Sequence, residues 1–490
     1  MYEIIEYGNN KSMHCILFFF CYICERKKGL SIFMEKSGGI AMKAKKSYRQ
    51  ILILLFLLSL CGIAVLSYYY INVSQIPDHV SVFQGREEVM SFLPKSWVLP
   101  VNGRILSQET EEEGKEETEM KEESLSVSQY MGTKKLPSDL LHINLSDKVA
   151  IHAQKEGQYQ MEIRCFGILM KKVNLQVLKE QNVIPSGNLV GIYGRTNGVL
   201  VLGTGLVTDL HGKKKEPAYN IVRSGDYIIE VDNVKITKKE ELLSRLEESD
   251  GSTMELTLRR DGKEITVTMK PIQTRDEGYR LGIWVRDDTQ GIGTMTFSTE
   301  DGKFGALGHA ITDIDTGEVM ALSQAGLYEA EIASITKGKP GEPGEISGII
   351  HLNDENKIAS ILQNTFQGIF GTLSSELSEK EKKQSIPVAL RQEITAGAAK
   401  IYCQIDGKLE EYQVEIEKID KNPDIESKGM VIHIVDEKLL EKTNGIIQGM
   451  SGSPIIQKGK FIGAVTHVFV NDSTRGYGIF AENMVFNLQN

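Results

Sequence analysis

Hydrophobic and polar positions alternate along most of this chain, whereas helical periodicity is confined to a few segments. Residues 149–153, 159–168, 253–258 and 264–269 place apolar side chains at every second position. Alternation of this kind is typical of strands that bury one face. Residues 276–490 continue it, with Gly, Thr and Val abundant and amphipathic helices scarce. We therefore expect a mainly β protein.

One segment departs from this pattern near the N-terminus. Residues 51–71 form an uncharged apolar run, and a helix of about 20 such residues spans a hydrocarbon core of roughly 30 Å. Basic residues precede the run at Lys43, Lys45, Lys46 and Arg49. The positive-inside rule then predicts a single-pass membrane protein with a cytoplasmic N-terminal segment, 1–50, and the bulk of the chain outside the cytoplasm. A cleaved signal peptide and a later start codon remain open alternatives.

Composition divides the exported part into regions. Residues 73–180 predict a small β domain, interrupted by an acidic loop at 109–123 with nine Glu against two Lys. The net charge of −10 argues against a nucleic-acid partner, since phosphate binding needs a clustered basic face. Beyond the apolar run only Cys165 and Cys403 remain, so disulfides do not build the fold, and whether these two pair stays open.

Residues 185–275 combine strands with one amphipathic helix. Leu242, Leu243 and Leu246 share a helical face within 238–248, and the run from Gly225-Asp226 to Val231 resembles bacterial PDZ domains. The resemblance implies that a peptide adds as a strand beside Val190, Gly191 and Ile192, with Leu242 and Leu246 on the opposite wall of the groove. The peptide is a partner or a segment of the chain itself. A PDZ-shaped spacer with an empty groove is the alternative.

A candidate nucleophile lies near the C-terminus. Residues 449–454 read Gly-Met-Ser-Gly-Ser-Pro, which places Ser451 between glycines immediately before an apolar strand pattern. Such a turn presents a serine hydroxyl and leaves backbone N–H groups free to hold an oxyanion. His309 stands upstream between small residues, several aspartates follow it, and the order His, Asp, Ser is that of chymotrypsin-like peptidases.

Three longer stretches make the comparison specific. Residues 304–313, 445–456 and 463–472 together closely resemble the SpoIVB family of serine peptidases. The resemblance implies a chymotrypsin-like double β-barrel over 276–490, in which His309 is the general base for Ser451. It also implies an oxyanion hole formed by the N–H groups of Gly449 and Ser451.

The family's catalytic aspartate corresponds to Asp436, which lies fifteen residues before Ser451. Chymotrypsin relatives keep this residue nearer the histidine, so Asp313 and Asp315 are rivals. The strand that ends with Thr466 and His467 is expected to face the substrate backbone.

These features predict a serine endopeptidase that needs no cofactor and no metal. The nine histidines include no His-Glu-x-x-His pair, which disfavours a metalloprotease. The family resemblance further implies a sporulation signal in the space between forespore and mother cell. Such a protein cleaves itself and a regulatory membrane protein, so that an intramembrane protease processes a sigma factor precursor. The alternative is a non-catalytic PDZ signalling scaffold on a degenerate protease fold.

Overall fold

A computed structural model of the chain describes residues 40–74, 76–90, 101–107, 141–145, 149–165, 167–275, 278–374 and 384–489. The chain divides into two units, Met1–Ile76 and Pro77–Asn490, and each is described by itself. The acidic loop 109–123, most of segment 1–50 and the Cys165 side chain lie outside the described residues.

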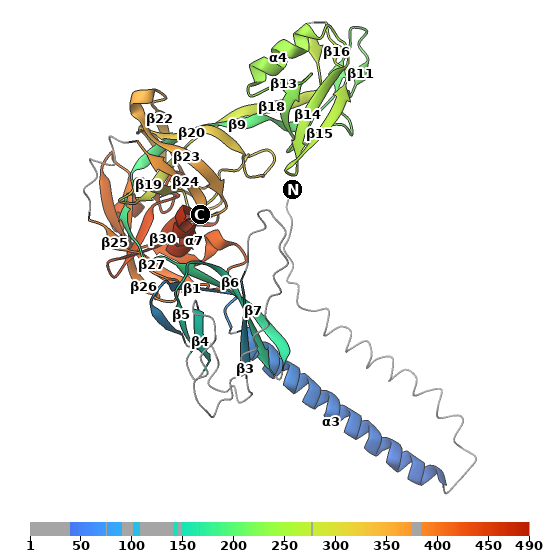
Figure 1. Cartoon of the computed structure of the whole chain (residues 1–490), viewed down its shortest axis with the longest axis vertical. Coiled ribbons are helices and arrows are strands. Elements are labelled where there is room, and N and C mark those ends of the chain that lie inside the picture. The colour runs from blue at the N-terminus through green and yellow to red at the C-terminus, as the bar shows by residue number, and fades with distance from the viewer. Residues whose placement is uncertain are drawn as a thin grey trace. The chain divides into compact units, whose positions relative to one another are not determined.

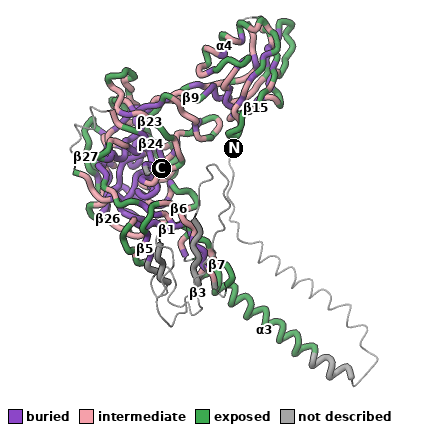
Figure 2. The backbone as a smooth tube through the Cα atoms, in the orientation of Figure 1, coloured by how far each residue is buried: buried purple, intermediate pink, exposed green. Residues whose placement is uncertain are grey.

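The first unit contains one long helix, α3 (Ile40–Ser74). Figure 2 shows it exposed where its burial is described, and its apolar stretch Tyr48–Ile71 has 24 residues and a mean hydropathy of 2.7. Among the described residues it is the one helix long and apolar enough to cross a membrane. A membrane span and an export signal both have this length and composition.

The second unit begins with the predicted small β region. One sheet has the strand order β1-β7-β6-β3 and the other has the order β2-β5-β4. Their bounds are β1 (His79–Phe83), β2 (Glu87–Met90), β3 (Val101–Ser107), β4 (Leu141–Leu145), β5 (Val149–Ala153), β6 (Gly157–Cys165) and β7 (Ile168–Leu178). Ser81 of β1 donates a hydrogen bond to the buried Glu482 of α7 (Ala481–Gln489), which attaches this region to the C-terminal helix.

Six strands then close a ring, the first barrel. Their pairings run β9-β20-β23-β24-β19-β18 and return to β9. The strands are β9 (Leu189–Thr204), β18 (Ile283–Ser298), β19 (Lys303–Ala306), β20 (Leu322–Tyr328), β23 (Lys357–Thr365) and β24 (Gly368–Leu373), with β8 (Asn182–Pro185) and β25 (Ile386–Pro387) extending the sheet beyond β18. Its core holds buried side chains such as Phe304 and Leu327.

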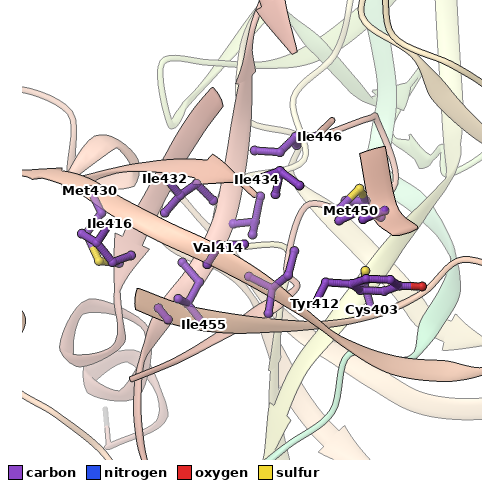
Figure 3. Packing of buried hydrophobic residues seen from close by; sticks show 14 of the residues in the cluster. Cys403, Tyr412, Val414, Ile416, Met430, Ile432, Ile434, Ile446, Met450 and Ile455 are labelled. Atoms are coloured by element: carbon purple, nitrogen blue, oxygen red, sulfur yellow. The ribbon is translucent and has the colours of Figure 1, made fainter. Parts of the chain in front are cut away.

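A second barrel follows, closed in the order β26-β27-β28-β31-β30-β29. Its strands are β26 (Gly397–Gln404), β27 (Leu409–Ile419), β28 (Met430–Ile434), β29 (Pro454–Gln457), β30 (Lys460–Phe469) and β31 (Asp472–Phe480). Alternate residues of β26, β27 and β28 point inward, as Figure 3 shows for Cys403, Val414 and Ile432. Two closed barrels confirm the predicted mainly β, chymotrypsin-like architecture.

A separate hydrophobic core forms between residues 199 and 285, here called the inserted domain. It contains β12 (Tyr227–Val231), β14 (Met254–Arg260), β15 (Lys263–Met269) and α4 (Lys239–Glu248). Leu242 and Leu246 of α4 are buried in this core, and Glu241 accepts the N–H groups of Thr237 and Lys238 at the start of the helix. The predicted helix and strands are therefore present.

The inserted domain interrupts the first barrel. Strands β9 and β18 have 16 residues each and pair antiparallel from Leu189–Thr294 to Thr204–Ile283, so they run from the barrel into the inserted domain (Figure 1). The prediction that Val190, Gly191 and Ile192 line the PDZ groove is therefore wrong. They lie at the barrel end of β9, where Val190 and Ile192 are buried in the barrel core.

The remaining elements are short. They are β10 (Val207–Thr208), β11 (Lys214–Lys215), β13 (Val234–Lys235), β16 (Ile272–Gln273), β17 (Tyr279–Arg280), β21 (Ala330–Thr336), β22 (Glu345–Ile350), η1 (Asp354–Asn356), η2 (Glu426–Lys428) and α6 (Glu437–Thr443).

Candidate active site

The loop that carries Ser451 is anchored by apolar side chains that precede the serine. Ile446 and Met450 are buried in the core of the second barrel, where Figure 3 shows them beside Ile434 and Tyr412. Ser451 itself is half-buried at the mouth of the cleft. The serine is thus presented by a rigid loop at the start of β29.

Both glycines of the motif are required by the backbone. Gly449 and Gly452 have φ values of 99° and 98°, which side chains rarely tolerate. A Cβ atom on Gly452 would lie 2.1 Å from the carbonyl oxygen of Thr294. The glycines therefore allow the turn and the close approach of β18 to it.

Within residues 449–453, two backbone N–H groups have no acceptor in the described structure. Among the described residues the N–H groups of Gly449 and Ser451 have no acceptor, whereas those of Met450, Gly452 and Ser453 each donate to a carbonyl. The carbonyl of Gln448 accepts from Ile346, and that of Met450 accepts from Ser453. Since C=O and N–H point in opposite directions across a trans peptide, the N–H groups of Gly449 and Ser451 point away from those partners. The pair has the character of an oxyanion hole.

Thr294 of β18 holds the loop from the first barrel. Its Oγ1 donates to the Gly449 carbonyl at 2.8 Å, its N–H donates to the Ser451 carbonyl at 3.0 Å, and its own carbonyl accepts from Leu307 at 3.3 Å. Thr294 is buried. It was not among the residues predicted from the sequence, because a contact over 155 residues leaves no local pattern.

His309 follows a sharp turn after β19. Leu307 and Gly308 have φ values of 69° and 73°, and Gly308 lies against Thr466 and Ile479 of the second barrel. The His309 Nδ1 atom lies 2.8 Å from the Ala310 carbonyl, which only accepts, so Nδ1 carries the proton and Nε2 keeps its lone pair. Burial lowers the pKa of His309, although the Ala310 hydrogen bond opposes the shift.

A cleft of about 660 Å³ brings the predicted site residues together. His309, Gly449, Ser451, Thr466 and His467 all line it. The Ser451 hydroxyl donates to the Thr466 carbonyl at 2.6 Å. The β30–β31 register shifts between Val465 and Val468, and this bulge leaves the Thr466 carbonyl available to the serine.

Ser453 has a different environment. It is fully buried, and its Oγ has no hydrogen-bond partner among the described residues. Unlike Ser451, it does not line the cleft. These differences favour Ser451 as the reactive serine.

The structure does not bring Asp436 to His309. Asp436 is the N-cap of α6, where its carboxylate accepts the N–H groups of Leu439 and Gln413, and it does not line the cleft. The assignment of Asp436 as the residue that orients the histidine is therefore corrected to a capping role. A signal for it was present in the sequence, since an Asp directly before Glu-Lys-Leu-Leu is typical of a helix start.

The rival aspartates also have other partners. Asp313 is buried, pairs with Arg286 of β18 and accepts the N–H groups of Asp315 and Thr316. Asp315 binds the same guanidinium at 2.8 Å. Both stabilise the loop after His309 and neither contacts its ring in the described structure.

The groove of the inserted domain lies beside α4. A cavity of about 650 Å³ is lined by Leu242 and Leu246 on one side, and by 205–208 and 280–285 on the other. Leu206 and Trp284 are exposed there. Leu242 and Leu246 line this cavity, and the strand segment that lines it is 205–208 in place of 190–192. That a peptide binds here stays a prediction.

The barrels, the serine cleft and the inserted domain define a serine peptidase with a PDZ domain. A family model for the SpoIVB peptidase S55 matches residues 277–485, and one for the Tricorn protease PDZ domain matches residues 217–274. Over residues 277–485 the chain is therefore similar to the SpoIVB peptidase family S55.

Solved structures show more distant likeness. The active form of Rv3671c protease from M. tuberculosis is 12% identical, with 41% of this chain and 74% of that chain covered and a TM-score of 0.24. The HtrA-type protease AlgW with a decapeptide is 10% identical, with 62% and 64% covered and a TM-score of 0.22. A PDZ domain of an SdrC-like protein from Listeria monocytogenes is 20% identical, with 18% and 87% covered and a TM-score of 0.15. These scores add no argument, and no curated protein matches the chain.

Proposed function

We propose that this chain is a serine endopeptidase in which Ser451 is the nucleophile and His309 the general base. The observation that carries the proposal is the shared cleft, which His309, Gly449 and Ser451 all line. The N–H groups of Gly449 and Ser451 have no acceptor in the described structure. A serine, an imidazole with a free Nε2 and an oxyanion hole together suit acyl transfer.

The reaction follows from these positions. His309 Nε2 removes the Ser451 proton as the hydroxyl oxygen bonds to the scissile carbonyl carbon. The N–H groups of Gly449 and Ser451 hold the negative oxygen that forms. His309 then gives the proton to the leaving amine as the peptide bond breaks, and water attacks the acyl-enzyme by the same route.

Substrate binding sets the serine free. At rest the Ser451 hydroxyl is bound to the Thr466 carbonyl, which lies in the bulge of the strand expected to face the substrate. A substrate backbone N–H that takes this carbonyl displaces the hydroxyl, which then turns to His309. In this scheme the Ala310 carbonyl, rather than a carboxylate, fixes the histidine tautomer.

The proposed biological setting is based on the similarity to peptidase family S55 and on α3. We propose that α3 anchors the peptidase with its N-terminus in the cytoplasm, because basic residues precede the apolar stretch. The S55 match supports a sporulation protease. In this proposal the peptidase cleaves itself and a regulatory membrane protein of an intramembrane protease complex. A peptide bound in the PDZ groove controls the access of substrate to the cleft.

Incubation of the purified full-length chain tests this proposal. We expect time-dependent self-cleavage in the native protein and in Ser453→Ala, whose hydroxyl has no partner to lose. Ser451→Ala should abolish cleavage and keep the native far-UV circular dichroism. Mass spectrometry of the products measures both.

Loss of cleavage in Ser453→Ala with retention in Ser451→Ala contradicts the assignment of the nucleophile. Absence of cleavage in every form, for self and for added peptides, supports the non-catalytic PDZ scaffold.

A further inference from the structure

Two histidine rings face each other in the cleft. The ring centroids of His309 and His467 are 5.0 Å apart, and the ring planes are inclined by 40°. Both residues line the cleft, His309 from the turn after β19 and His467 from the bulge of β30. The reaction proposed above uses His309 and leaves the imidazole of His467 without a role.

The spacing matches that of two imidazoles on one metal ion. Two rings bound to a tetrahedral Zn²⁺ at Zn–N distances of about 2.0–2.1 Å have centroids about 5 Å apart. The observed centroid separation of 5.0 Å equals that spacing.

The ring nitrogens are available for such an ion. The Nδ1–H of His309 donates to the Ala310 carbonyl, which leaves Nε2 free and supplies the backbone partner that zinc-bound histidines commonly have. Neither nitrogen of His467 makes a hydrogen bond within the described structure.

Lys428 places a positive charge close enough to act on His467. The Lys428 cation opposes a second positive charge, although its ammonium lies over the Tyr477 ring, 5.2 Å from the centroid.

We propose that His309 and His467 form a two-histidine site that binds Zn²⁺ reversibly and inhibits the peptidase. Water completes the coordination, and the metal occupies the lone pair of the general base. The described residues contain no group of three or more His, Cys, Asp or Glu side chains that could hold an ion. The ion is thus an exchangeable inhibitor and not a structural metal. The inhibition rests on the proposed function, whereas the binding does not.

Titration calorimetry of the full-length chain with ZnCl2 tests the binding. We expect His467→Ala and His309→Ala to weaken one site by about tenfold or more, since each removes one of two protein ligands. His433→Ala is the matched control. His433 of β28 has its Nδ1 atom 3.2 Å from the Glu417 Oε1 atom, so these two side chains are an alternative pair of zinc ligands outside the cleft. It should leave this site unchanged. MgCl2, whose ion prefers oxygen ligands, should give no comparable heat.

His467→Gln provides a second variant that keeps a polar side chain, and thermal unfolding verifies that every variant is folded. Equal zinc affinity in native protein, His467→Ala and His467→Gln overturns the proposal and leaves an ordinary stacked pair.

Peptide hydrolysis gives the second readout. Each variant's rate is divided by its own zinc-free rate, and the zinc concentration for half inhibition should rise about tenfold or more in His467→Ala but not in His433→Ala. EDTA should restore activity. If the native chain binds zinc through these histidines yet hydrolyses nothing, the proposed function fails while the site stands. If it hydrolyses peptide with equal zinc sensitivity in all variants, the inhibitory site fails while the peptidase stands.

Discussion

At the scale of single residues, backbone groups set most of the cleft's chemistry. The proposed oxyanion donors are the N–H groups of Gly449 and Ser451, and His309 is hydrogen-bonded to the Ala310 carbonyl. The serine rests on the carbonyl of Thr466. Backbone groups are fixed by the fold, so the cleft is organised before substrate arrives.

Thr294→Val tests whether the hydrogen bond from the Thr294 hydroxyl to the Gly449 carbonyl supports catalysis. Loss of the hydroxyl leaves the buried Gly449 carbonyl without its donor, at a cost of about 1–3 kcal/mol in stability. Because the oxyanion donors then lose their alignment, we expect kcat/KM to fall by about tenfold or more. Peptide hydrolysis and chemical denaturation measure the two effects.

Thr296→Val is the matched control, since Thr296 is buried on the same strand and its Oγ1 has no partner in the described structure. It should be neutral or stabilising. An equal loss of kcat/KM in both variants would mean that the Thr294 hydroxyl has no specific role in catalysis.

The lowered pKa of His309 predicts how activity depends on pH. Burial disfavours the imidazolium, so the base stays neutral, and active, at pH values below its ordinary pKa of 6.5. The acid limb of the kcat/KM profile should therefore have its midpoint below pH 6.5. A midpoint at or above that value contradicts a buried, neutral base.

At the scale of elements, β18 connects the two functions of the molecule. Its first part pairs with β9 in the inserted domain, and its second part carries Thr294 to the cleft. Between them Arg286 binds Asp313 and Asp315 in the loop that follows His309. The strand therefore connects the inserted domain to the loop that follows the proposed base, and we propose it as the route of coupling between them.

Arg286→Ala tests this route. It leaves the buried Asp313 carboxylate without its cation, although two backbone N–H groups still bind it. We expect the loop after His309 to loosen and kcat to fall severalfold with the fold intact. Arg245→Ala, which breaks an exposed pair with Glu248 on α4, should have no effect. Unchanged kinetics in Arg286→Ala would exclude a catalytic role for this ion pair.

Alternation along the sequence predicted the strands well but not their partners. Val190, Gly191 and Ile192 were correctly read as a strand, yet β9 is long enough to serve two domains, and a local pattern does not reveal where one ends. A Cβ atom on Gly191 would lie 2.4 Å from Ile350 of β22, a contact no local signal indicates. The serine motif was recognisable because the positive φ angles of its turn require glycine at fixed positions next to the serine. The hydrogen bond of His309 to the Ala310 carbonyl has no sequence signature, since every residue has a carbonyl.

At the scale of the whole molecule, the cleft depends on both barrels. The first barrel supplies His309 and Thr294, and the second supplies Ser451 and the Thr466 carbonyl. Neither barrel alone carries the proposed nucleophile, base and oxyanion hole. The PDZ domain is inserted between β9 and β18 of the first barrel. Both connections to the barrel are therefore strands, and these two strands are hydrogen-bonded to each other.

The central claim is that Ser451 is a nucleophile activated by His309. Labelling of the full-length chain with a fluorophosphonate, followed by mass spectrometry of the digested protein, tests it most directly. The account predicts one covalent adduct on Ser451, formed far more slowly in His309→Ala and at the native rate in Ser453→Ala. An adduct on Ser453, or no adduct on a folded native chain, would contradict it.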